Sequence, residues 1–263
     1  MRWQDLTSVE IEAAAAAGAT VVLPVGAIEQ HGTHLPVSTD ATCAEAIAMA
    51  AAQRTNTAAP PVLAPTLQFG YSDDHAGFPG TLSLSQRVLE DALVDIGSSI
   101  LASGFQRLLY LNGHGSNDRL LYYVVRRVRE RARGPVALAA TTYWKLASRE
   151  LGELRVSEPG GMGHACELET SLMLHFVPRL VHMDLAIKEV PASYSEHRGD
   201  DLLSGGAVVA PDRFRERTAS GVLGDPLAAD ELRGARFAAV IVDRLAAFLD
   251  EFAGWPLLQG GPA

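Results

Sequence analysis

Short apolar runs alternate with longer amphipathic or alanine-rich segments along the chain. The run TVVLPV at Thr20–Val25 is rich in β-branched residues and is followed by Gly26, which predicts a buried strand. Comparable runs predict further strands at 62–67, 107–111 and 136–142. The apolar pattern therefore predicts four strands between residues 20 and 142.

The segments between and after these runs favour helices. Thr39 or Asp40 can cap an alanine-rich helix that ends near residue 54, and Ser85 is suited to cap the next one. The predicted helices cover 40–54, 85–103, 117–133, 167–176 and 230–252. Strands that alternate with helices predict an α/β fold with a mostly parallel sheet and helices on both of its faces.

This pattern shows no linker between domains. A single domain is predicted over residues 1–263, with a C-terminal tail at 254–263. The segment 187–226 is rich in Gly, Pro, Ser and charge, and it predicts a long irregular loop. Such a loop in a compact domain often serves as an active-site lid or an oligomer contact.

Composition excludes several classes of protein. The 263 residues are 48% hydrophobic and 20% charged, which is typical of a globular domain. A net charge of −9 without basic clusters argues against nucleic-acid binding. No apolar run reaches the ~18–20 residues of a membrane span, and the acidic N-terminus is unlike a signal peptide. Because only two cysteines occur, we expect a cytoplasmic protein.

Histidines and acids gather in the loops that follow two predicted strands. Glu29, His31 and Asp40 lie in EQHGTHLPVSTD after the first strand, and His114 follows the strand at 107–111. Ligands of parallel sheets bind beyond the carboxyl ends of the strands, so these loops predict a functional site. The Asn112 and Asn117 side chains are expected to fix the second loop or to orient His114.

A later segment, HACELETS, offers another histidine and two glutamates. If it is helical, His164, Glu167 and Ser171 share one side and Glu169 points elsewhere. Mixed imidazole and carboxylate ligands suit Zn²⁺ or Mn²⁺. The whole set is large enough for two ions that share a bridging carboxylate.

Each of these residues also has a structural interpretation. A single histidine in a strand-end loop is more often structural than a ligand, so only the convergence of several loops favours a metal site. His34 is expected either to support a metal ligand or to make a loop hydrogen bond, and Cys166 to be a small packing residue. Glu169 is expected either to support a ligand or to lie on the helix surface. Structural or surface roles are expected for His175, His182 and His197.

Four motifs resemble the creatininase (creatinine amidohydrolase) family. They are LPVGAIEQHGTHLPVSTD at Leu23–Asp40, GYSDDHAGFPGT at Gly70–Thr81, YLNGHGSN at Tyr110–Asn117 and GHACELETS at Gly163–Ser171. The resemblance spans residues 1–180 in the same order. It implies a three-layer α/β/α sandwich with two divalent metal ions per subunit (Zn²⁺, Mn²⁺ or Fe²⁺) and a homo-oligomer, commonly a hexamer.

The resemblance also implies a ligand set. Glu29, Asp40 and His114 would hold one ion, and Asp40 would bridge to a second ion held by His31 and a further glutamate. In creatininase that glutamate stands two residues after the NGH histidine, where this chain has Ser116. Relatives without it carry a glutamate in an H-A-G-E motif. Glu167 takes that place here and is predicted to complete the set.

Catalytic and substrate residues follow from the same motifs. His164 matches the family's active-site histidine, and it is predicted to carry a proton beside a catalytic Glu167. Trp144 matches a tryptophan that lines the substrate site. Tyr71 and Ser116 are predicted to bind substrate with it.

Together these features predict a dinuclear metal-dependent hydrolase that cleaves a C–N amide bond of a small molecule. A cyclic amide, a formamide or a peptide-like compound would fit. Creatinine itself is not expected, because PGGMG at 159–163 replaces a Trp and a Glu of creatininase. The alternatives are a metal-dependent C–C hydrolase or isomerase acting on a polyol-derived ketone, and a non-catalytic binding protein on the same fold.

Overall fold

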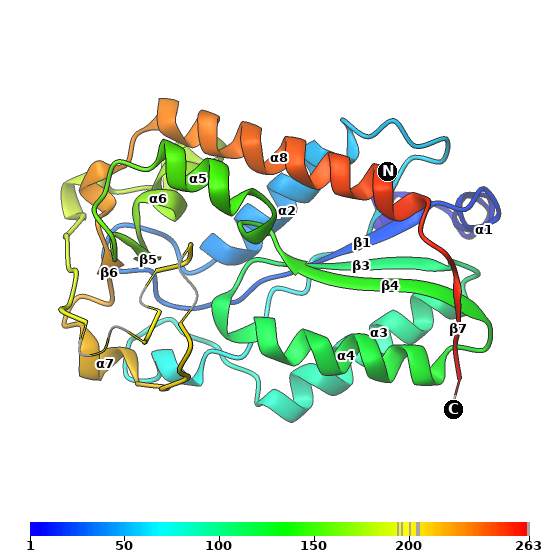
Figure 1. The fold of residues 1–263 in the computed structure, drawn as a ribbon, viewed down its shortest axis with the longest axis horizontal. Helices are drawn as coiled ribbons and strands as arrows, with labels where there is room; N and C mark the ends of the chain where they lie inside the picture. Colours follow the sequence, from blue (N-terminus) through cyan, green and yellow to red (C-terminus); the bar gives the residue numbers. More distant parts are fainter. Residues whose placement is uncertain (194, 196, 200, 204–205, 262–263) are drawn as a thin grey trace.

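A five-stranded sheet forms the middle layer of the molecule (Figure 1). The computed structural model describes residues 1–193, 195, 197–199, 201–203 and 206–261. The strands lie in the order β2 (Val62–Leu63), β1 (Thr20–Val25), β3 (Arg107–Asn112), β4 (Pro135–Thr142) and β7 (Leu258–Gln259). The first four strands are parallel, and β7 is antiparallel to β4. The prediction of a mostly parallel sheet is therefore confirmed.

Helices cover both faces of this sheet. One face carries α2 (Thr39–Ala52), α5 (Ser148–Leu154), α6 (Glu167–Phe176) and α8 (Glu231–Ala253), and the other carries α3 (Gln86–Ala102) and α4 (Asp118–Arg131). Successive residues of a strand point to opposite faces. Leu109 and Leu111 of β3 accordingly join the core under α8, whereas Leu108 and Tyr110 join the core under α3 and α4. Burial on both faces explains the uninterrupted apolar strands, and the three-layer α/β/α architecture is confirmed.

Several short elements differ from the sequence prediction. Helix α1 (Ser8–Ala16), which begins with a capping box between Thr7 and Glu10, and helix α5 were not predicted. The strand predicted at 62–67 is shorter, and only an isolated bridge from Leu67 to Val25 continues it. The predicted C-terminal tail contains β7, which pairs with β4 at Pro135 and Val136.

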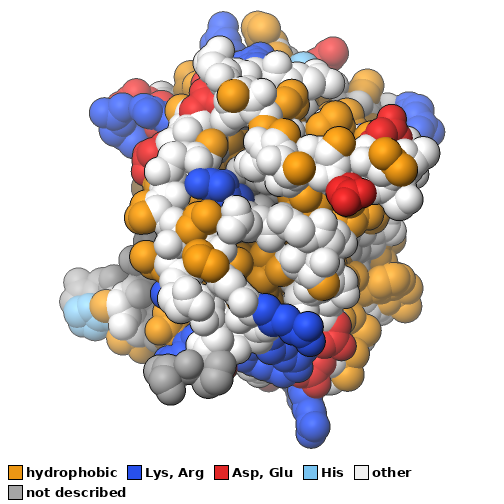
Figure 2. All heavy atoms as spheres, turned by 90° about the vertical axis from the view of Figure 1, so that its right-hand side faces the viewer, with side chains coloured by type: hydrophobic (Ala, Val, Ile, Leu, Met, Phe, Trp, Pro, Cys, Tyr) orange, Lys and Arg blue, Asp and Glu red, His pale blue; other side chains and the backbone are white. Residues whose placement is uncertain are grey.

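The loops that follow β1 and β3 lie at the end of the molecule that carries β5 (Met162–His164), β6 (Leu223–Gly224) and α7 (Phe214–Arg217). In its described part, segment 187–226 is largely irregular, as predicted, apart from α7 and β6. The opposite end, seen in Figure 2, carries its Lys and Arg side chains in separate groups. No helix among the described residues is long and apolar enough to cross a membrane.

Helix α6 is held against α8 by a close backbone approach at Gly234. A Cβ atom added to Gly234 would lie 1.9 Å from the carbonyl oxygen of Ser171. A glycine at this point of α8 lets the two helices approach more closely than any residue with a side chain would allow. The approach fixes the position of α6, whose first turn reaches the candidate site described below.

We expect Gly234→Ala to destabilise the protein by roughly 1–3 kcal/mol, because the added methyl group must push α6 away from α8. Urea unfolding measures this change. Gly152→Ala in α5 is the matched control, since its added Cβ meets no atom within 4 Å, and it should be neutral or stabilising by up to about 1 kcal/mol. Equal destabilisation by both variants would contradict the close packing.

Candidate metal centre

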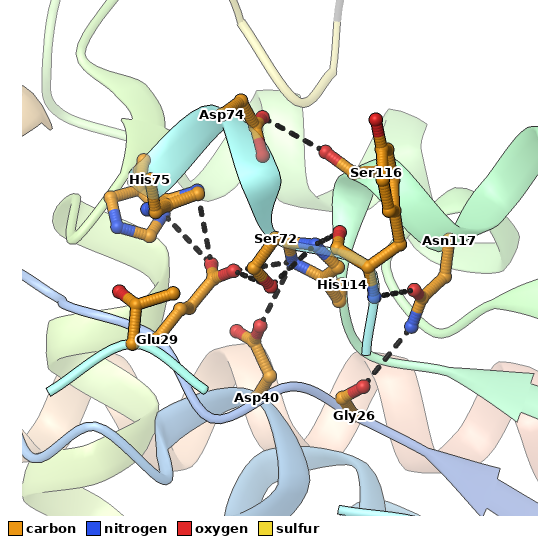
Figure 3. A network of polar contacts seen from close by, with 12 residues as sticks. Gly26, Glu29, Asp40, Ser72, Asp74, His75, His114, Ser116 and Asn117 are labelled. Carbon is orange, nitrogen blue, oxygen red and sulfur yellow. Dashed lines mark hydrogen bonds and ion pairs between the residues drawn. The ribbon is translucent and has the colours of Figure 1, made fainter. Parts of the chain in front are cut away.

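Two glycines bring the start of α2 against the ends of β1 and β3. A Cβ on Gly26 would lie 2.5 Å from Cα of Ala41, and one on Gly113 would lie 2.6 Å from the carbonyl oxygen of Asp40. Only glycine permits this approach. It places Asp40, in the first turn of α2, directly beside His114 at the end of β3 (Figure 3).

Two asparagines fix the loops around these residues. Asn117 donates to the carbonyl of Gly26 at 3.1 Å and accepts from the amide of Tyr71 at 3.0 Å, so it joins three separate loops. Asn112 accepts from the amide of His114 at 3.1 Å and donates to its carbonyl at 2.6 Å. The expected role of these side chains in fixing the turn at His114 agrees with these contacts.

Three buried histidines each use one ring nitrogen to donate a hydrogen bond to a main-chain carbonyl. His31 Nδ1 donates to Glu29 O at 3.1 Å, His114 Nε2 to Tyr71 O at 2.8 Å, and His164 Nε2 to Gln30 O at 2.7 Å. A carbonyl oxygen can only accept, so the bonded nitrogen of each neutral ring carries the proton. In the neutral ring the other nitrogen has the lone pair, and this is the form that a metal ligand requires.

The second ring nitrogens of these histidines lie close to buried carboxylates. Asp40 lies between two rings, with Oδ1 3.1 Å from His31 Nε2 and Oδ2 3.1 Å from His114 Nδ1. Glu29 Oε2 lies 3.2 Å from His114 Nδ1, and Glu169 Oε1 lies 4.0 Å from His31 Nε2. Three groups of potential ligand atoms result, each within 4.8 Å: Glu29, His31 and His164; Glu29, Asp40 and His114; and His31, Asp40 and Glu169.

The donor atoms fit divalent cations. Glu29 Oε1 and Asp40 Oδ2 are buried, and neither makes a hydrogen bond. An unsatisfied buried carboxylate oxygen is strongly unfavourable unless a cation faces it. Imidazole nitrogen and carboxylate oxygen are the ligands that Zn²⁺ and Mn²⁺ take in proteins.

The pKa shifts in the cluster show that its buried carboxylates favour positive charge on the groups beside them. Burial opposes charge on His31, but the carboxylates of Asp40, Glu169 and Glu29 outweigh it and raise the pKa of His31 to about 9. Burial raises the pKa of Glu169 to about 7, against the influence of His31. Burial also acts to raise the pKa of Asp40, but His31 and His114 hold it well below its usual range. The protons held by His31 and Glu169 thus offset the negative charge of the cluster, and bound cations would take over this role.

Glu169 lies in this cluster, whereas Glu167 does not. The carboxylate of Glu167 accepts hydrogen bonds from the amides of Val156 and Ser157 at 3.0 and 2.8 Å, and Arg233 Nε lies 3.6 Å away. Its oxygens are therefore already satisfied by the protein. Glu167, which was predicted to be a ligand and a catalytic residue, thus lies outside the three groups of potential ligand atoms.

The helix predicted at 167–176 is present as α6, but His164 does not continue its spacing. His164 ends β5, and the chain turns at Ala165, which has a φ of 49°. The helix begins only at Glu167, so the side of α6 that faces His31 carries Glu169. His34 lies behind this helix, with Nε2 2.8 Å from the hydroxyl of Thr170, in agreement with the loop hydrogen bond expected for it.

Sequence reasoning assigned no role to two residues of the site, Ser72 and His75. The Ser72 hydroxyl donates to Glu29 Oε2 at 2.6 Å, and His75 Nε2 lies 3.4 Å from Glu29 Oε1 (Figure 3). Gln30 Nε2 donates to His75 Nδ1 at 3.0 Å. Both residues belong to GYSDDHAGFPGT, in the loop after the strand predicted at 62–67, so the motif and its place after a strand were both signals.

A cavity of about 120 Å³ opens above the carboxylates. Its lining includes Glu29, Asp40, His114, His164 and Glu169, together with Ser116, Trp144 and Phe214. A wider pocket of about 620 Å³ shares Ser116, Trp144, His164 and Phe214 with it and also reaches Tyr71. The three predicted substrate residues, Tyr71, Ser116 and Trp144, thus all lie around one opening to the site.

Comparison with known proteins assigns the class. The sequence matches the creatininase (creatinine amidohydrolase) family model over residues 4–249. It is 34% identical over 229 residues to the mycofactocin precursor peptide peptidase of Mycobacterium ulcerans (85% of this chain, 82% of that protein). It is 32% identical over 204 residues to creatinine amidohydrolase of Pseudomonas putida (72% and 77%).

The fold leads to the same family. A solved structure described as "Creatininase Mn" has a TM-score of 0.79 at 27% identity and covers 95% of this chain and 97% of its own. The family match and the relatives define an amidohydrolase, and the buried histidine–carboxylate cluster supplies its candidate metal ligands. The chain belongs to the creatininase family.

We expect Glu169→Gln to lower the metal content of the purified protein, because an amide oxygen is a weaker ligand than a carboxylate. Elemental analysis after dialysis measures the bound Zn²⁺ and Mn²⁺. Glu167→Gln is the control: it should keep its metal but lose several degrees in Tm, since it weakens the buried bonds to Val156 and Ser157. Wild-type metal content in Glu169→Gln would contradict the assignment.

The pKa shifts predict how the chelator-treated protein responds to pH. The folded-state pKa of His31 is raised from about 6.5 to about 9, and that of Glu169 is raised from 4.5 to about 7. The stability that a raised pKa contributes is present below the unfolded-state value and is lost as the pH rises through the folded-state value. The lowered pKa of Asp40 adds no slope above pH 6, because this group is ionised in both states there.

The Tm of the metal-free protein should therefore fall between pH 6.5 and 9, as measured by differential scanning calorimetry. Saturating Zn²⁺ should stabilise the protein more at the upper end of this range, because the ligands must be deprotonated to bind. His31→Gln should flatten the metal-free slope, and His182→Gln, at an exposed site, should not. A metal-free Tm that rises over the same range would contradict this account.

Proposed function

We propose that the protein hydrolyses a C–N amide bond of a small molecule with two divalent ions, Zn²⁺ or Mn²⁺, held at this cluster. One observation carries the proposal: the two oxygens of Asp40 face two different histidines at 3.1 Å each. A carboxylate that divides its oxygens between two sets of ligands is suited to bridge a metal pair.

Each half of the cluster would hold one ion. Glu29, Asp40 and His114 would bind the first, and His31, Asp40 and Glu169 the second. Structures of creatininases described as manganese and zinc–zinc forms support this choice of metals. Ser72, which donates to Glu29, would orient that ligand, as hydrogen bonds to metal-binding side chains do in other proteins.

When bound, two such ions would polarise the amide carbonyl and lower the pKa of a water molecule toward neutrality. The chain itself provides the proton carrier. Burial and the neighbouring His31 and His75 hold the pKa of His164 well below its usual range, so the ring is neutral at pH 7. Its Nε2 is fixed on Gln30 O, which leaves Nδ1 free to take up a proton and to deliver it to the departing nitrogen.

The space above the cluster limits what can react there. A cavity of about 120 Å³ has room beside the metal ligands for a small group only, and the pocket of about 620 Å³ can hold the rest of the substrate. A small or peptide-like amide meets both conditions. The predicted homo-oligomer, a hexamer by family resemblance, stays a prediction.

We expect His164→Gln to lower kcat about 10²–10⁴-fold, the usual contribution of a general acid–base, while the metal content stays unchanged. The assay measures amine or formate released from formamides, cyclic amides and short peptides with Mn²⁺ or Zn²⁺ added. His182→Gln is the matched control and should retain activity.

Release of no amine or formate from any of these amides by the metal-loaded wild type would count against the proposal. Conversion of a polyol-derived ketone to a nitrogen-free acid would then support the C–C hydrolase instead. Full activity of His164→Gln on a substrate that the wild type does cleave would remove His164 from the mechanism while leaving the hydrolase assignment intact.

A further inference from the structure

Asp74 faces the reaction cavity without serving its metal ligands. It lies in a turn of 3-10 helix, Asp73–His75, and lines both the inner cavity and the outer pocket. Its Oδ2 accepts a hydrogen bond from the Ser116 hydroxyl at 3.0 Å (Figure 3). Its Oδ1 is buried and has no hydrogen-bond partner.

Asp74 Oδ1 can accept a hydrogen bond, but no group of the protein donates one to it. A buried carboxylate oxygen without a hydrogen bond from the protein is unfavourable unless an ion, a water molecule or a ligand faces it. Asp74 belongs to none of the three groups of potential ligand atoms, so a shared metal ion does not account for it. The donor that it lacks is therefore most simply provided by the molecule that enters the cavity.

The walls around Asp74 restrict the size of that donor. Phe214 of α7 stacks on the His75 ring at 3.8 Å between centroids and meets the His164 ring edge-on at 4.8 Å. Phe214 and Leu202 also line the cavity, which has about 120 Å³ in all. Because a water molecule takes up roughly 30 Å³ of liquid, only a few atoms fit between Asp74 and the ligand cluster.

We propose that Asp74, held by Ser116, determines specificity by accepting a hydrogen bond from an amino group adjacent to the scissile amide of the substrate. The preferred substrates would then be amides with a compact primary amine on the acyl side, as in an aminoacyl amide. An ammonium group there would be repelled by two divalent ions unless a carboxylate faced it. This inference rests on the proposed amide hydrolysis for its kinetic test, but not for its binding test.

A pair of substrates that differ only in the amine provides the kinetic test. Glycine p-nitroanilide has the amino group, and p-nitroacetanilide lacks it. In Asp74→Asn, kcat/KM for the first compound should fall roughly tenfold to hundredfold, mainly through KM, as expected for loss of a charge-assisted hydrogen bond. The value for the second compound should stay within about twofold.

Asp73→Asn is the matched control, because Asp73 is its exposed neighbour on the same turn. This variant should leave kcat/KM unchanged for both substrates. An equal loss for both substrates in Asp74→Asn, or no loss for either, would overturn the inference. So would a fall in metal content in Asp74→Asn, which would make Asp74 a ligand.

Binding is measured separately, so that a failure of the hydrolase proposal can be recognised. Glycinamide should raise the Tm of the metal-loaded wild type more than acetamide does, and Asp74→Asn should abolish this difference while Asp73→Asn keeps it. If the wild type cleaves neither anilide but shows this difference, only the hydrolase proposal fails for these compounds. If glycinamide and acetamide give equal shifts, the specificity inference fails whatever the activity.

Discussion

The position of Asp40 is the constraint on which the rest of the site depends. Its carboxylate lies between His31 and His114, residues that come from the ends of two neighbouring parallel strands. It reaches this point only because α2 begins in contact with Gly26 and Gly113, where a side chain would strike its backbone. The parallel sheet brings the two histidine loops to one edge. Gly26 and Gly113 allow α2 to pack against that edge, and Asp40 in its first turn therefore lies between the two rings.

The sequence could predict much of this arrangement, because parallel strands bring their carboxyl ends to one edge. Glu29, His31, Asp40 and His114 all lie just beyond such ends, and a buried strand is readily detected from its apolar run. Glu167 was favoured over Glu169 because it matches the family's H-A-G-E motif and was taken to share one helical side with His164. The helix begins at Glu167 as predicted, but the left-handed residue Ala165 takes His164 off the helical spacing, and alanine gives no signal of such a conformation.

The residues that the sequence did not reveal share one property: they act through contacts distant in the chain. Ser72 and His75 reach Glu29 from a loop that precedes α3, and Phe214 comes from the irregular segment 187–226 to stack on His75. Gln30 joins these parts, since it donates to His75 and to the carbonyl of Gly221. Periodicity does not predict such contacts, because they depend on how the loops pack over the finished sheet.

The three histidines fixed by main-chain carbonyls have a consequence for how such a site can change over time. Because the backbone of Glu29, Gln30 and Tyr71 selects the free nitrogen of each ring, the side chains around the opening can be exchanged without altering the proton positions of the rings. Ser116, Asp74 and Phe214 belong to the exchangeable part. Backbone carbonyls thus set the protonation of the candidate metal ligands, whereas side chains around the opening set substrate preference. The substrate preference can therefore change while the metal ligands stay the same.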